Sequence, residues 1–85
     1  MNPYRVSVHI TPRSGILDPQ GKAVEGALHS LGFESVKSVR VGRHIVVDTE
    51  AENEEAAVAS VTAMCERLLA NPVIEDFEIE SASVA

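Results

Sequence analysis

Apolar and polar residues alternate near both ends of the chain. Every second residue from Tyr4 to Ile10 is apolar, and the residues between them are polar or charged. The same alternation returns over residues 73–80. A period of two that includes β-branched side chains predicts strands with one buried face. We therefore expect a first strand over residues 4–10 and a last strand over residues 73–80, followed by a frayed tail over residues 81–85.

The segment between the first strand and Gly32 carries the pattern of an amphipathic helix. Asp18 suits the N-cap, and Pro19 suits the first helical position, where a missing N–H costs nothing. Apolar residues then recur at i, i+3, i+4 and i+7, which places them on one stripe. The stripe consists of Val24, Ala27, Leu28 and Leu31. Gly32 is expected to end this helix as a left-handed C-cap.

A second helix is expected to begin within residues 50–55 and to end at Asn71. Its start is rich in Glu, which suits the positive end of the helix dipole. Pro72 prevents the helix from continuing. Its broad apolar face consists of Ala57, Val58, Val61, Met64, Cys65, Leu68 and Leu69.

Two short strands are expected between these helices, over residues 36–41 and 43–49, with Gly42 at the turn of a hairpin. The resulting order is β-α-β-β-α-β, which is typical of an α+β, ferredoxin-like fold. Right-handed crossovers then place both helices on one face of a four-stranded antiparallel sheet. Residues 1–85 are expected to form a single domain of this kind.

The other face of that sheet has no cover in the chain itself. By alternation it receives both charged and apolar side chains: Arg5, Ser7, His9, Val36, Arg40, His44, Val46, Asp48, Ile74, Asp76 and Glu78. The face either lies in water or packs against the same face of a second copy. A chain of 85 residues has a small core, and Val46 and Ile74 need cover, which favours dimerisation through the sheet.

Charge and cysteine content narrow the class of protein. A net charge of −6 argues against nucleic acid as a partner. The first ten residues do not resemble a signal peptide, and no apolar run approaches the ~20 residues needed to cross a membrane. The single cysteine, Cys65, cannot form an internal disulfide and suits a reducing compartment, so we expect a cytoplasmic protein. The uneven acidic charge suits either a complex held by complementary charge or simple solubility.

No catalytic residue and no metal site are predicted. His9 and His44 are expected to be neighbours on the uncovered face, but zinc needs three or four protein ligands and no further soft ligand is within reach by spacing. We therefore interpret them as surface or interface histidines. Cys65 falls on an apolar helix stripe, which indicates a buried structural thiol and not a nucleophile.

Three further patterns are weak as binding sites. Gly15 and Gly21 flank a helix start, but Asp18 occupies the cap and repels anions. Successive strand residues point to opposite faces, so the pair Glu75 and Asp76 is not expected to share a cation. Arg40 and Arg43 flank the predicted hairpin turn, where they either bind a carboxylate or phosphate or keep the strand edge soluble; these two interpretations stay open.

Several blocks of sequence resemble the PurS family. They are VHITPR at residues 8–13, ILDPQG at 16–21, AL at 27–28, LGF at 31–33, VRVGR at 39–43, MC at 64–65 and LLANPVIE at 68–75. The resemblance covers nearly the whole chain from Tyr4 to Ile79, and the LDPQG and LLANPVIE blocks are specific in order and spacing. Arg13 and Arg43 stand where the family usually has Lys, and both keep the charge.

The resemblance implies a function in de novo purine biosynthesis. PurS is the small subunit of phosphoribosylformylglycinamidine synthase, an ATP- and glutamine-dependent amidotransferase. The resemblance implies a homodimer or tetramer that bridges a large synthetase subunit, PurL, and a glutaminase subunit, PurQ. It also implies that the chain assists ammonia transfer between these two subunits. ATP and Mg are expected on the large partner, and this chain is expected to bind no cofactor of its own.

Stiff turns and charged corners are the expected partner contacts. They are Arg13, Asp18, Pro19, Gln20, Gly21, Arg43, Asn71, Pro72, Val73, Ile74 and Glu75. The same residue types also serve the fold, with Asp18 as a cap, Pro19 as a helix starter and Pro72 as a helix stop. The alternative function is a ferredoxin-like regulatory domain that binds a small molecule, and it rests on fold analogy alone.

Overall fold

The computed structural model describes residues 1–13 and 18–85. Its elements in chain order are β1 (Asn2–Pro12), α1 (Pro19–Ser30), β2 (Arg43–Ala51), α2 (Glu54–Met64), a π-helical turn (Cys65–Leu69) and β3 (Glu75–Val84). Both helices lie where the sequence predicts them. The Asp18 and Asn53 side chains cap them, accepting hydrogen bonds from the backbone N–H groups of Gly21 and Ala56. Gly32 has a φ of 100° and ends α1 in the left-handed conformation, as predicted.

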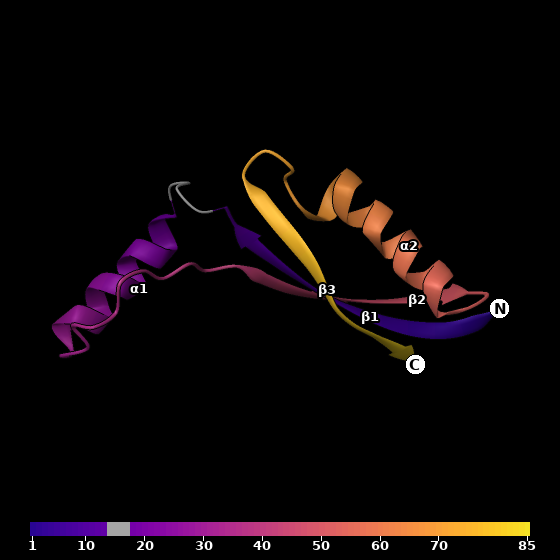
Figure 1. Ribbon diagram of the computed structural model, residues 1–85, viewed down its shortest axis with the longest axis horizontal. Coiled ribbons are helices and arrows are strands. Elements are labelled where there is room, and N and C mark those ends of the chain that lie inside the picture. The colour runs from indigo at the N-terminus through magenta and orange to yellow at the C-terminus, as the bar shows by residue number, and fades with distance from the viewer. Residues whose placement is uncertain (14–17) are drawn as a thin grey trace.

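Over the described part of the chain, the sheet has three antiparallel strands in the order β2-β1-β3. The prediction of four strands is therefore wrong. Residues 36–41 do not form a strand, because they run alongside α1 beyond the end of the sheet, where no strand of the described residues lies beside them (Figure 1). Gly42 is accordingly no hairpin turn. It passes so close to the carbonyl oxygen of Ile10 that a Cβ at this position would collide with it.

The C-terminal strand is longer than predicted. Residues 81–84 were expected to fray, but they belong to β3 and pair with the first half of β1, from Tyr4↔Val84 to Ser7↔Ser81. The ladder hydrogen bonds order this segment, and the N–H of Ala85 donates to the carbonyl of Pro3 at 3.1 Å. The register shifts between Ser7 and Val8, so that β3 carries one extra residue, Glu80, as a bulge.

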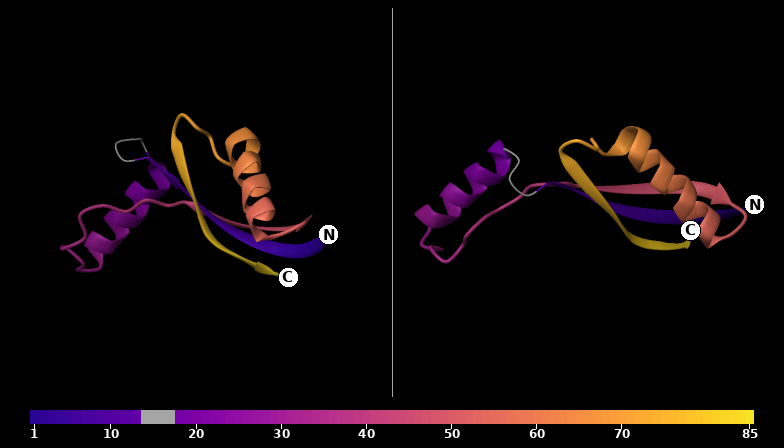
Figure 2. Two further views of the ribbon diagram at one scale, coloured as in Figure 1. Left: turned by 45° about the vertical axis from the view of Figure 1, so that its right-hand side comes forward. Right: turned by 45° about the horizontal axis from the view of Figure 1, so that its top comes forward.

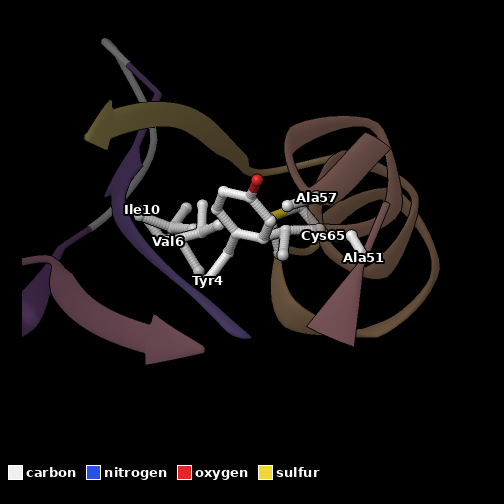
Figure 3. Packing of buried hydrophobic residues seen from close by; sticks show 9 residues of the cluster. Tyr4, Val6, Ile10, Ala51, Ala57 and Cys65 are labelled. Carbon is white, nitrogen blue, oxygen red and sulfur yellow. The ribbon is translucent and has the colours of Figure 1, made fainter. Parts of the chain in front are cut away.

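The core lies between the sheet and α2. The apolar residues of β1 point toward the helix, and Val6, Val8 and Ile10 are fully buried (Figure 3). Ala57, Val61 and Cys65 meet them from α2 and the turn that follows. Small side chains let the helix approach the strands closely. The predicted structural role of Cys65 is confirmed: it is fully buried, and burial raises the pKa of its thiol.

The first helix does not lie on the sheet. Together with residues 31–42, α1 forms an extension that we call the arm, which projects from one end of the sheet (Figures 1 and 2). The molecule measures 52 × 25 × 14 Å and has a radius of gyration of 16.2 Å, whereas a compact chain of this length has about 12 Å. The prediction that two helices cover one face is therefore wrong, since only α2 does so. The apolar stripe of α1 is consequently open to solvent, with Leu31 74% exposed.

Candidate partner interface

The residues predicted to contact partners gather at one end of the sheet, at the base of the arm. Here β1 ends and β2 and β3 begin, with Ile10 paired to Arg43 and Pro12 to Glu75. Arg13 follows β1 directly, and its backbone N–H donates to the carbonyl of Ile74 at 2.9 Å. Segments that are far apart in the sequence therefore meet at this end of the sheet.

Glu75 is the centre of a hydrogen-bond network at this end. Its Oε1 accepts hydrogen bonds from Arg43 Nη2 at 2.7 Å and from the backbone N–H of Asn71 at 2.8 Å. The same Nη2 donates to the carbonyl of Leu69 at 3.0 Å. The Glu75 side chain is only 18% exposed. Its hydrogen bond from the Asn71 backbone and its pairing with Arg43 lower the pKa of the Glu75 carboxyl.

This network holds a sharp corner between the helical turn and β3. The carbonyl of Asn71 accepts from the N–H groups of Ile74 at 3.2 Å and Glu75 at 2.8 Å. The Asn71 side-chain oxygen accepts from the N–H of Val73 at 3.0 Å, which is an Asx-turn. Pro72 and Val73 are left pointing outward, with Val73 74% exposed, and Ile74 is 40% exposed. The corner therefore presents apolar side chains on a backbone held by several hydrogen bonds.

A hollow of about 290 Å³ lies beside the corner. Its lining includes Arg13, Pro72 and Asp76, together with the helical turn that carries Cys65. Arg13 Nε lies 3.1 Å from Asp76 Oδ1, on the exposed side of β3. Glu75 and Asp76 thus contact different arginines.

The Asp18 turn joins the two ends of the arm. Asp18 Oδ1 accepts from the N–H of Gly21 at 3.0 Å, and Oδ2 accepts from the N–H of Val41 at 2.9 Å. These two hydrogen bonds lower the pKa of the Asp18 carboxyl. Gly21 is buried, and a Cβ there would collide with the carbonyl oxygen of Val39. Asp18 and Gly21 therefore serve the fold directly, while Pro19 and Gln20 face solvent.

Two expectations about side chains change in the structure. Arg40 does not flank a hairpin turn; its Nη1 lies 3.5 Å from the carbonyl of Pro12, at the base of the arm. Sequence reasoning also missed Glu80, whose carboxylate lies beside His9 and His44 on the face of the sheet that points away from α2. The bulge that brings Glu80 there depends on strand register, so no local pattern indicates it. Gly15, considered for a phosphate cradle, lies outside the described residues.

Comparisons with known proteins agree on one family. The family model of PurS, described as phosphoribosylformylglycinamidine (FGAM) synthase, matches residues 5–83. The PurS subunit of Methanocaldococcus jannaschii is 44% identical over 77 residues, which cover 91% of this chain and 93% of the relative.

Two solved structures have the same fold. PurS of Thermus thermophilus superposes with a TM-score of 0.85 at 42% identity and covers 98% of both chains. A chain from the PurLQS structure of Thermotoga maritima superposes with a TM-score of 0.82 at 34% identity over the full length of both. Because family model, sequence and structure all match over nearly the whole length, the chain belongs to the PurS family, the PurS subunits of phosphoribosylformylglycinamidine synthase in purine biosynthesis.

Proposed function

We propose that this chain is a bridging subunit, which holds a PurL-type synthetase and a PurQ-type glutaminase together so that ammonia passes between them. The likeness to a chain of the PurLQS structure supports such an assembly. The observation that carries the proposal is the corner at residues 71–75. It exposes apolar side chains on a backbone fixed by the Arg43–Glu75 network, which suits a docking surface that loses little entropy on binding.

The chemistry of the complex is assigned to the partners. Cys65, whose thiol is buried and has a raised pKa, is unsuited to release ammonia from glutamine. ATP and Mg are bound by the large subunit in this proposal, and the complex is cytoplasmic. The contribution of this chain is to keep two active sites in register and closed to bulk water.

We further propose that the chain forms a homodimer through its sheet, with the arm of one copy packed on the sheet of the other. In a closed ferredoxin-like fold α1 would cover its own sheet, beside α2. Here the stripe of α1 is exposed, and Ile45 and Val47 of β2 remain only half-buried on the face that α2 shares. Two copies can exchange arms so that each stripe covers the partner's strands, as in domain swapping.

Reconstitution tests the bridging role. The purified chain is mixed with the PurL-type and PurQ-type subunits of the same organism, and amidation is followed with glutamine or with excess ammonium as the nitrogen source. We expect glutamine-dependent turnover to require this chain and ammonium-dependent turnover to proceed without it. Equal glutamine-dependent rates with and without the chain would refute the bridging role.

A further inference from the structure

Three potential metal ligands converge on the face of the sheet that points away from α2, which we call the open face. They are His9 of β1, His44 of β2 and Glu80 of β3. Each comes from a different strand, and each is about half exposed, with side-chain exposures of 48%, 50% and 49%. The ligand atoms of these three side chains lie close enough together to hold one metal ion. No other such group of three His, Cys, Asp or Glu side chains is found within residues 1–13 and 18–85.

The sheet itself positions the three side chains. His9 and His44 are directly opposed in the β1–β2 ladder, and their rings stack with centroids 4.9 Å apart. On the other side of β1, residue 78 is the direct partner of His9. The bulge adds Glu80 to β3 and directs its carboxylate to the same place, so ligand placement depends on strands and not on loops.

The ligand atoms lie at separations close to those of a zinc site. Glu80 Oε2 lies 2.7 Å from His9 Nε2 and 3.4 Å from His44 Nε2, and the ligand atoms all lie within 4.8 Å of one another. Tetrahedral Zn²⁺ with bonds of about 2.0–2.1 Å holds its ligand atoms about 3.3 Å apart. The separations therefore suit the ion, and the two stacked imidazole rings must turn out of their stack until the lone pairs of both Nε2 atoms point at it.

We propose that His9, His44 and Glu80 bind a Zn²⁺ ion, with water as the fourth ligand. Two imidazole nitrogens and one carboxylate are a donor set that zinc accepts. An ordinary surface ion pair joins one histidine to one carboxylate, whereas here two ring nitrogens face the same oxygen. The site departs from the sequence-based prediction of no metal, because the third ligand becomes apparent only in the sheet.

Titration of the untagged, metal-free chain with Zn²⁺ tests the site by calorimetry. We expect one ion per chain, and affinity lower by about tenfold or more in His9→Ala, His44→Ala and Glu80→Gln, since even residues that merely orient ligands are worth that much. Circular dichroism verifies that these variants fold. We expect them to fold, because the three side chains are about half exposed. Glu78→Gln is the matched control, because it removes a neighbouring charge from the same face, and His29→Ala removes the histidine of α1.

The two outcomes are distinct. The site is supported if Zn²⁺ binding is saturable and is weakened by the three ligand variants alone. Absence of binding by the parent chain, or equal weakening by the control variants, overturns it. Replacement of Zn²⁺ by Co²⁺ adds a spectroscopic check: the site predicts visible d–d bands without a thiolate charge-transfer band, because Cys65 lies buried on the opposite side of the sheet.

Discussion

Asp18 accepts a hydrogen bond from the backbone N–H of Val41, 23 residues further along the chain, at 2.9 Å. Its second carboxylate oxygen caps α1 by accepting from Gly21. One side chain thus joins the start of the arm to the segment that returns from it. Because the arm lies off the sheet, contacts of this kind, together with the His29–Val36 hydrogen bond, hold its two segments together.

Stability should therefore fall in acid. The pKa values of the Asp18, Asp48 and Glu75 carboxyls are all lowered in the fold, by backbone hydrogen bonds at Asp18 and Glu75 and by Arg5 at Asp48. A lowered folded-state pKa stabilises the fold above the ordinary carboxyl pKa of about 4 and loses this effect as the pH falls through the folded-state value. We expect the melting temperature to decline below about pH 4. The decline should be shallower in Asp18→Asn, since Asn does not titrate; an identical slope in this variant would contradict the role of Asp18.

Two glycines of the same helix should respond in opposite ways to alanine. Gly21→Ala places a Cβ against the carbonyl oxygen of Val39, so we expect a loss of about 1–3 kcal/mol in the free energy of unfolding. A Cβ at position 26 would have no atom of another segment within 4 Å. Gly26→Ala should therefore stabilise the chain by about 0.5–1 kcal/mol, the usual gain in a helix interior. Urea unfolding measures both, and a loss at both positions would show that the arm tolerates no added volume.

Local pattern predicted most elements of this fold. Alternation located β1 and β3, and the cap signals located α1, because capping and strand burial act over a few residues. Local pattern failed where the structure of a segment depends on pairing with residues far away in the sequence. Residues 36–41 look like a strand but lie beyond the sheet, and residues 81–84 look like a tail but find β1 as a partner.

The candidate site was predictable to the same extent. The turn residues Asp18 and Asn71 are recognisable because Asp, Asn and Pro have local conformational roles. The Arg43–Glu75 pair joins residues 32 positions apart and required the assembled sheet. Glu80 required the register shift as well. Register is a property of the whole ladder, so no segment of the sequence contains it.

The arm should govern oligomeric state. If it packs on a second copy, Leu31→Ser and Phe33→Ser should convert the dimer to monomer, because they remove side chains that are 74% and 56% exposed in the single chain. Light scattering after gel filtration measures the mass at matched concentrations. Val46→Ser is the matched control on the open face, where Val46 is 49% exposed. Dissociation by Val46→Ser alone would place the contact on the open face and contradict the arm exchange.

The Arg43–Glu75 pair should hold the corner without dominating stability. Arg43→Met removes the hydrogen bonds to Glu75 and Leu69 and leaves Glu75 only the N–H of Asn71. We expect a loss of about 1 kcal/mol in the free energy of unfolding, as for other partly exposed ion pairs. Arg43→Lys keeps the charge and should recover most of it. Urea unfolding of the two variants and of the parent chain measures the difference, and an equal loss in both would mean that the position of the Nη2 group, not the positive charge, holds the corner.

The corner at residues 71–75 should be the point at which the larger subunits dock. Val73→Glu places a charge where the apolar side chain is 74% exposed, so the fold should stay intact. Assembly with the PurL-type and PurQ-type subunits should weaken by about tenfold or more, because the interface would bury an unpaired charge. Leu68→Glu is the matched control, since Leu68 is 82% exposed on the preceding helical turn, outside the corner. Gel filtration of the mixed subunits at a series of concentrations measures assembly. Both variants add the same charge to a largely exposed apolar position. Assembly lost only in Val73→Glu therefore locates the docking surface at the corner, and assembly lost only in Leu68→Glu moves it to the helical turn.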